Sequence, residues 1–95
     1  MTVRDFIIDG IIDFVKENRK FCFTYKQFMK FYFRKVRERR YPYIFWHTIE
    51  RTIRRLAEER LLVRLDKGKF VVFCVTDSLL VLRDLRKEEI LLGVV

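Results

Sequence analysis

The sequence predicts a small, mostly α-helical domain that contains one β-hairpin, in the order helix, helix, helix, strand, strand, helix. Three observations support this class. The chain has 95 residues, enough for one domain with a core of modest size. Hydrophobic residues make up 51% of it and recur at helical spacing, which argues against disorder. Only three Gly and one Pro are present, so long regular elements with short connections are expected.

The first two helices are predicted over residues 3–18 and 25–37, with a short apolar connection between them. Each begins with a threonine that is followed three residues later by Asp or Gln, the spacing of a capping box. The two pairs are Thr2 with Asp5 and Thr24 with Gln27. Apolar residues then recur at i, i+3, i+4 and i+7. Gly10 costs the first helix roughly 1 kcal/mol relative to Ala, and we interpret it as room for another backbone.

The third helix is predicted over residues 44–59, just after Pro42, which is tolerated at a helix start. A projection at about 100° per residue puts one apolar set on the core side. That set is Phe45, Trp46, Ile49, Ile53, Leu56 and Ala57. The opposite side carries His47, Arg51, Arg54 and Glu58. Because Glu50 is the only acidic residue before Glu58, this side differs from an ordinary solvated face, where both signs occur.

A β-hairpin is predicted over residues 61–75. Two apolar, β-branched runs flank the turn at 66–69, in which Gly68 suits a positive φ. The tip of the hairpin therefore carries Lys67 and Lys69.

A fourth helix is predicted over residues 78–90, after three residues that are all favourable N-caps. The chain then continues to Val95 without a charge. Because such a tail is unfavourable in water, we expect another surface to cover it. Residues 77–95 are thus predicted to form a dimerisation helix and tail. The interface leucines are expected to be Leu79, Leu82, Leu85, Leu91 and Leu92.

The positive charge is concentrated in the middle of the chain. The formal net charge is +8. Residues 19–55 contain twelve basic and two acidic residues, a net charge of +10, whereas residues 1–18 carry −2 and residues 56–95 are neutral. A charge that only aids solubility would be distributed more evenly. The concentrated excess is typical of a surface that binds nucleic acid.

The two cysteines, Cys22 and Cys74, are interpreted as buried free thiols. A disulfide within or between chains stays open as the alternative. Intracellular disulfides occur mainly in hyperthermophiles, and this chain has one Asn, one Gln and 36% charged residues, a composition typical of proteins from hot environments.

No catalytic, metal or cofactor site is predicted. His47 is the single histidine and no Cys/His cluster accompanies it, so a zinc site is not expected. Ser78 suits an N-cap better than a nucleophile. Asp5, Asp9 and Asp13 recur at intervals of four on the first helix and are interpreted as a solvated face. No membrane span or small-molecule ligand is expected, and the chain is predicted to be a cytoplasmic protein that is not an enzyme.

Residues 48–64 carry a resemblance to a known family. An arginine-rich helix ends in the stretch Leu56-Ala57-Glu58-Glu59-Arg60 and leads directly into an apolar strand. Together with the order of elements over residues 3–76, this resembles the winged helix-turn-helix DNA-binding proteins. In size and in Phe and Arg content the chain is similar to the small members encoded by archaea and archaeal viruses. Arg60 departs from the pattern, since the family usually has Gly at this helix end.

The resemblance implies a DNA-binding surface. In that family the second helix of the helix-turn-helix pair lies in the major groove, so helix 44–59 is expected there, with the hairpin tip 66–69 as a wing. The residues expected at base edges are His47, Thr48, Arg51 and Arg54. The residues expected at phosphates are Lys26, Lys30, Arg39, Arg40, Arg55, Lys67 and Lys69.

Two functions follow as hypotheses. The first is a transcriptional regulator that binds double-stranded DNA as a homodimer, in the host cytoplasm if the chain is viral. The second is a winged-helix module that binds another protein and has no sequence-specific DNA binding. Phe31, on the less apolar side of helix 25–37, motivates the second hypothesis.

Overall fold

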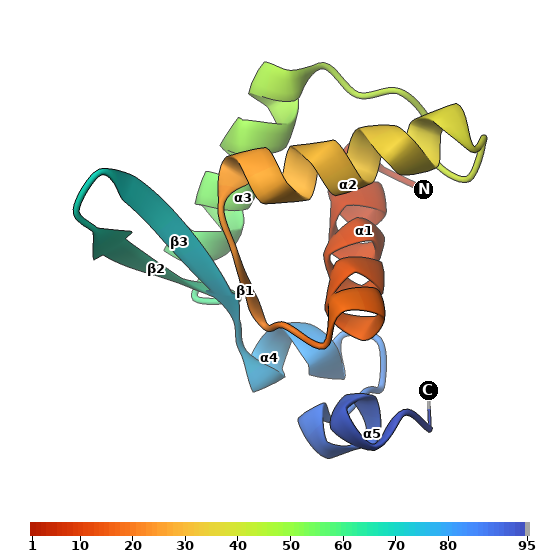
Figure 1. Ribbon diagram of the computed structural model, residues 1–95, viewed down its shortest axis with the longest axis vertical. Helices are drawn as coiled ribbons and strands as arrows, with labels where there is room; N and C mark the ends of the chain where they lie inside the picture. Colours follow the sequence, from red (N-terminus) through yellow and green to blue (C-terminus); the bar gives the residue numbers. More distant parts are fainter. Residues whose placement is uncertain (95) are drawn as a thin grey trace.

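The computed structural model describes residues 1–94, which form eight elements (Figure 1). Their bounds are α1 Val3–Asn18, β1 Cys22–Phe23, α2 Tyr25–Arg37, α3 Trp46–Glu58, β2 Leu62–Lys67, β3 Phe70–Val75, α4 Asp77–Val81 and α5 Lys87–Leu92. The described residues thus combine five helices with one three-stranded antiparallel sheet, an α+β architecture. Figure 1 shows the hairpin of β2 and β3 projecting from the helices, with α4 and α5 at the opposite end from the α2–α3 connection.

Helices α1 and α2 occupy the predicted ranges, and their first turns show why. The Thr2 hydroxyl accepts a bond from the Asp5 N–H (3.2 Å), and the Asp5 carboxylate accepts one from the Thr2 N–H (3.1 Å). Thr24 and Gln27 form the same reciprocal pair at 3.1 and 3.0 Å. Each box satisfies N–H groups that a helix start leaves without a partner.

The two-residue strand β1 is an element that the sequence prediction missed. Cys22 pairs with Cys74 and Phe23 with Phe73, so that β3 lies between β1 and β2. Two residues are too few to show the alternation of a strand, and their partner strand lies about fifty residues later in the chain. The local pattern therefore carried no sign of this pairing.

An aromatic core joins the sheet to the first two helices. The Phe23 ring, which is almost fully buried, lies 5.6 Å from the ring of Phe14, 5.5 Å from Phe28 and 6.3 Å from Phe73. Gly10 allows α2 to approach α1, because a Cβ added there would meet the Phe28 ring at 3.2 Å. The neighbours of Gly10 are thus aromatic side chains and not, as predicted, another backbone.

The cysteines form a disulfide, so the prediction of free thiols is wrong. Cys22 and Cys74 are bonded across the β1–β3 pair, with their Cα atoms 4.0 Å apart. Cys22 is exposed and Cys74 is half-buried. The intrachain bond was one of the alternatives left open, and it depends on the β1 pairing that the sequence did not reveal.

The predicted helix over residues 78–90 is divided into two shorter helices, which corrects that prediction. After α4 ends at Val81 the chain turns at Asp84, which has a left-handed φ of 55°. The turn brings both Leu80 of α4 and Ile90 of α5 into the core, where each is about 1% exposed.

Two of the five leucines predicted for a dimer interface pack within this chain. Leu79 is fully buried, so its assignment to an interface is wrong, and Leu85 is half-buried against the core. Leu82, Leu91 and Leu92 are exposed. Only these three remain available to a partner.

The aspartates of α1 bind other parts of the chain, which corrects their interpretation as a solvated face. Arg83 Nε donates to Asp9 at 2.8 Å, and the same guanidinium lies 3.6 Å from Asp5. The Tyr41 hydroxyl donates to Asp13. These acids therefore hold the α4–α5 segment and the α2–α3 connection against α1.

Reduction of the disulfide is expected to lower stability. The bond closes a loop over a sequence separation of 52 residues, for which the chain-entropy relation gives about 4 kcal/mol. We expect urea unfolding with a reductant to show a free energy of unfolding lower by about 2–4 kcal/mol. The double variant Cys22→Ser, Cys74→Ser is the control, and a reductant should leave it unchanged. Two free thiols titrated in the oxidised wild type would contradict the prediction.

Candidate nucleic-acid interface

Helix α3 is anchored by one buried face. Ile49, Ile53 and Leu56 are fully buried and recur at helical spacing. Thr52 Oγ1 donates to the Thr48 carbonyl at 2.8 Å, so this polar group is satisfied within the helix. With one face fixed against the core, the opposite face has a defined direction in solvent.

Five residues predicted to contact DNA lie together on the outer side of α3. At about 100° per residue, their order around the helix is Arg54, His47, Arg51, Arg55 and Thr48, an arc of about 120°. Thr48 is half-buried and the other four are exposed. We call this set the α3 arc. It contains all four residues predicted at base edges and one of those predicted at phosphates.

The arginines of the α3 arc have no ion-pair partner among residues 1–94. His47 lies 3.9 Å from Glu50, and the exposed Glu58 lies on the same side of α3 and lines one hollow together with Arg54. Glu59, one turn beyond Arg55, receives a hydrogen bond from Arg4 at 2.7 Å, which lowers the pKa of the Glu59 carboxyl. That carboxylate is therefore paired with Arg4, and the charges of the arc stay available to a partner.

Two hollows flank the α3 arc and make it a ridge. One, of about 360 Å³, lies between α3 and the start of α1, and Thr48, Arg51 and Arg55 line it. The other, of about 200 Å³, lies between α3 and the hairpin, and Arg54, Glu58 and Arg64 line it. A convex ridge with unpaired arginines suits insertion into a groove of a polyanion.

Arg64 is a candidate that the sequence prediction missed. It lies two residues after the buried Leu62 on β2, and residues two apart in a strand share a face. Arg64 therefore lies on the face of the hairpin that is turned towards α3. The alternation along the strand was the signal that could have found it.

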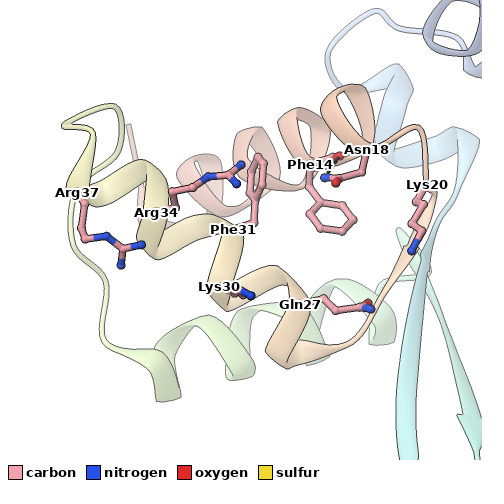
Figure 2. A pocket seen from close by; sticks show the side chains of 8 residues that line it. All are labelled: Phe14, Asn18, Lys20, Gln27, Lys30, Phe31, Arg34 and Arg37. Carbon is pink, nitrogen blue, oxygen red and sulfur yellow. Dashed lines mark hydrogen bonds between the residues drawn. The ribbon is translucent and has the colours of Figure 1, made fainter.

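Lys30 of α2 lies in a hollow apart from the α3 arc. Lys30 lines a separate hollow of about 270 Å³ between α1 and α2, which no α3 residue lines (Figure 2). Figure 2 shows this hollow with basic and amide side chains around two phenylalanine rings: Lys20, Gln27, Lys30, Arg34, Arg37, Asn18, Phe14 and Phe31. Lys26 is exposed on the first turn of α2 and lines none of the three hollows described here.

Phe31 is buried, so the observation that motivated a protein-binding module does not hold. Its ring packs edge-on against Phe14 at 5.3 Å and is about 5% exposed. Lys35 covers the ring at 5.2 Å and pairs with Glu17 at 2.8 Å. Lys35, a polar neighbour of Phe31 in the sequence, thus shields the ring from solvent.

Two tyrosines hold the connection that leads into α3. The rings of Tyr32 and Tyr41 stack with centroids 5.3 Å apart and planes at 12°. Tyr32 donates from its hydroxyl to the Pro42 carbonyl at 2.8 Å. The exposed residues Arg39 and Arg40, both predicted at phosphates, lie in this connection, and Arg39 has a left-handed φ of 61°.

Helix α3 begins at Trp46, two residues later than predicted, and this exposes two aromatic side chains. Phe45 is 52% and Trp46 is 43% exposed, so their assignment to the core is wrong. Ile44 fills the core position instead, with 6% exposure. Phe45 is the N-cap and provides no side-chain hydrogen bond to the helix.

The hairpin turn is shorter than the predicted 66–69, because Asp66 and Lys67 pair with β3 as part of β2. Gly68, with a φ of 74°, and Lys69 form a two-residue turn between β2 and β3. Lys67 ends β2, and both lysines are exposed without an ion-pair partner among residues 1–94. The tip thus adds two free charges at the end of a projecting element (Figure 1).

Comparison of the chain with protein-family models, curated proteins and solved structures finds no match. In the described part of the chain, no three His, Cys, Asp or Glu residues lie close enough to hold a metal ion. Of the helices within residues 1–94, none has the length and apolar character needed to cross a membrane.

The buried tyrosines are expected to make the fold sensitive to alkali. Burial raises the pKa of Tyr32 to about 12, and burial together with the bond to Asp13 raises the pKa of Tyr41. An unfolded tyrosine titrates near pH 10, so above about pH 10 the unfolded chain holds fewer protons than the folded one. The free energy of unfolding should therefore fall as the pH rises from about 10 to 12. Urea titrations along this range measure the slope. Tyr32→Phe should make it shallower, and an unchanged slope would contradict the assignment.

Proposed function

We propose that this protein is a winged helix-turn-helix regulator that binds double-stranded DNA. In this proposal α2 and α3 form the helix-turn-helix pair, α3 enters the major groove, and the β2–β3 hairpin is the wing. The observation that carries the proposal is the α3 arc, an exposed ridge with three arginines that have no ion-pair partner among residues 1–94.

The sheet order supports the assignment of a wing. The strand before the helix pair adds to a hairpin that follows α3 directly, in the order β1-β3-β2. The hairpin tip then lies beyond the α3–hairpin hollow and carries Lys67 and Lys69. A duplex held by α3 would be within reach of a projecting basic loop of this kind.

The residues of the α3 arc divide into two roles. Arg51 lies at the centre of the arc and Arg54 at its hairpin side, and both read bases, because guanidinium groups bind the major-groove edge of guanine. Arg55 lies towards the α1 side and contacts phosphate, as do the lysines of the hairpin tip. His47 and Thr48, nearer the start of α3, are placed at base edges.

Salt dependence and arginine variants test this proposal. We expect binding to duplex DNA to weaken with salt, with a slope of about −0.9 per phosphate contact. Arg51→Ala should cost about 1–3 kcal/mol and relax sequence preference, whereas Arg55→Ala should reduce the salt slope by about one contact.

Arg86→Ala is the matched control, because Arg86 is exposed at the α5 end of the molecule and loses the same charge. A titration of labelled duplex measures all four proteins. Equal losses for Arg51→Ala and Arg86→Ala, or binding that does not respond to salt, would contradict the proposed surface.

We also propose a homodimer that forms through the C-terminal segment. Leu82, Leu91 and Leu92 are exposed at the same end of the molecule, together with Val81 and Val94. Apolar side chains gathered at one end are typical of an interface. Two copies related by a two-fold axis would present two α3 helices to half-sites about 34 Å apart.

Sedimentation tests the dimer. The double variant Leu82→Glu, Leu92→Glu should sediment as a monomer at a concentration at which the wild type is a dimer, because each carboxylate would be buried without a partner. Leu65→Glu is the matched control, since Leu65 is an exposed leucine of the hairpin. A wild type that is already monomeric would refute the homodimer.

A further inference from the structure

Three aromatic rings are exposed where the α2–α3 connection enters α3. Tyr43 is 67%, Phe45 52% and Trp46 43% exposed. Their rings are not isolated, because Tyr43 lies 5.9 Å from the ring of Phe33, Phe45 lies 6.1 Å from Trp46, and the His47 ring rests against Trp46. We call Tyr43, Phe45 and Trp46 the aromatic edge.

The hydrogen-bonding edges of an intact duplex offer little to the Phe45 ring of the aromatic edge. Phenylalanine has no hydrogen-bonding group, and in the major groove it can offer only apolar contact with thymine methyl groups. Exposed rings of this size are unfavourable in water, and the neighbouring rings of Phe33 and His47 cover them only in part. The edge therefore has the character of a surface for a second type of contact.

The charged residues near the aromatic edge indicate which class of ligand it binds. Along the chain, Arg39 and Arg40 precede it and the arginines of the α3 arc follow it. The first turn of α3 contains no acidic residue, and Glu50 of the next turn lies 3.9 Å from His47. An apolar helix of a partner protein would gain no binding energy from contact with these cations. Flat rings between cations instead match unstacked nucleotide bases, whose faces stack on aromatic side chains while their phosphates bind the arginines.

We propose that the aromatic edge stacks on unpaired bases, so that the preferred ligand is DNA with unpaired nucleotides beside a duplex segment. This rests on the proposed function, because the α3 arc holds the duplex next to the edge. The duplex segment contacts Arg51 and its neighbours, and one or two extruded bases lie against Tyr43, Phe45 and Trp46.

The fluorescence of Trp46 gives a direct test, because this is the single tryptophan of the chain. Three probes are titrated at one salt concentration: a fully paired duplex of about 20 base pairs, the same duplex with a three-thymine bulge, and the thymine-rich single strand. We expect the bulged duplex to bind at least about fivefold more tightly than the paired duplex and to quench Trp46 emission more strongly.

Two variants separate stacking from duplex binding. Phe45→Ala and Tyr43→Ala keep Trp46 as the reporter and should abolish the preference for the bulge while leaving affinity for the paired duplex unchanged. Phe70→Ala is the matched control, because Phe70 is an exposed phenylalanine of the hairpin with 57% exposure. It should retain the preference. Circular dichroism of each variant confirms that it is folded.

The outcomes distinguish this proposal from the proposed function. Equal affinity for bulged and paired duplexes, with unchanged Trp46 emission, would overturn stacking and leave duplex binding intact. A preference for the bulge that survives both Phe45→Ala and Tyr43→Ala would also overturn it. Failure to bind any of the three probes would overturn both proposals, and it would favour a protein partner for the aromatic edge.

Discussion

The burial of Phe23 is the interaction on which the other contacts of this fold depend. Its ring touches Phe14 of α1, Phe28 of α2 and Phe73 of β3, so one side chain joins four elements of the chain. A phenylalanine at such a buried site contributes about 3–5 kcal/mol relative to Ala. Because β1 has only two residues, the Phe23 ring and the Cys22–Cys74 bond, and not the strand length, hold β1 in the sheet.

Cys22, the residue before Phe23, links the same segment to the hairpin through a covalent bond. Successive residues of a strand point to opposite faces, so Phe23 enters the core while Cys22 bonds to Cys74 on the outer face. Strand β3 is thereby fixed on both faces against the segment that leads into α2. The base of the hairpin is consequently tied to the segment that leads into α2.

The sequence predicted the elements whose causes are local and missed those whose causes are distant. Capping boxes and helical periodicity were sufficient for α1 and α2, whose bounds agree with the prediction. The strand β1, the disulfide and the turn at Asp84 each depend on residues more than fifty positions away or on the core that receives them. The helical wheel predicted that Trp46 is buried. In the structure Ile44 is buried and Trp46 is exposed.

The same difference between local and distant causes explains which parts of the candidate site could be predicted. The α3 arc could be predicted, because its buried face was visible in the spacing of Ile49 and Ile53. The basic residues of α2 could not be sorted from sequence, because their roles depend on which side α1 covers. Lys35 forms an ion pair with Glu17 of α1, so its charge is neutralised within the chain. The acids of α1 are likewise paired within the chain, and Glu58 is the acidic residue that stays exposed beside the arginines of α3. Pairing of acidic residues elsewhere in the chain thus leaves a net positive charge on the outer side of α3.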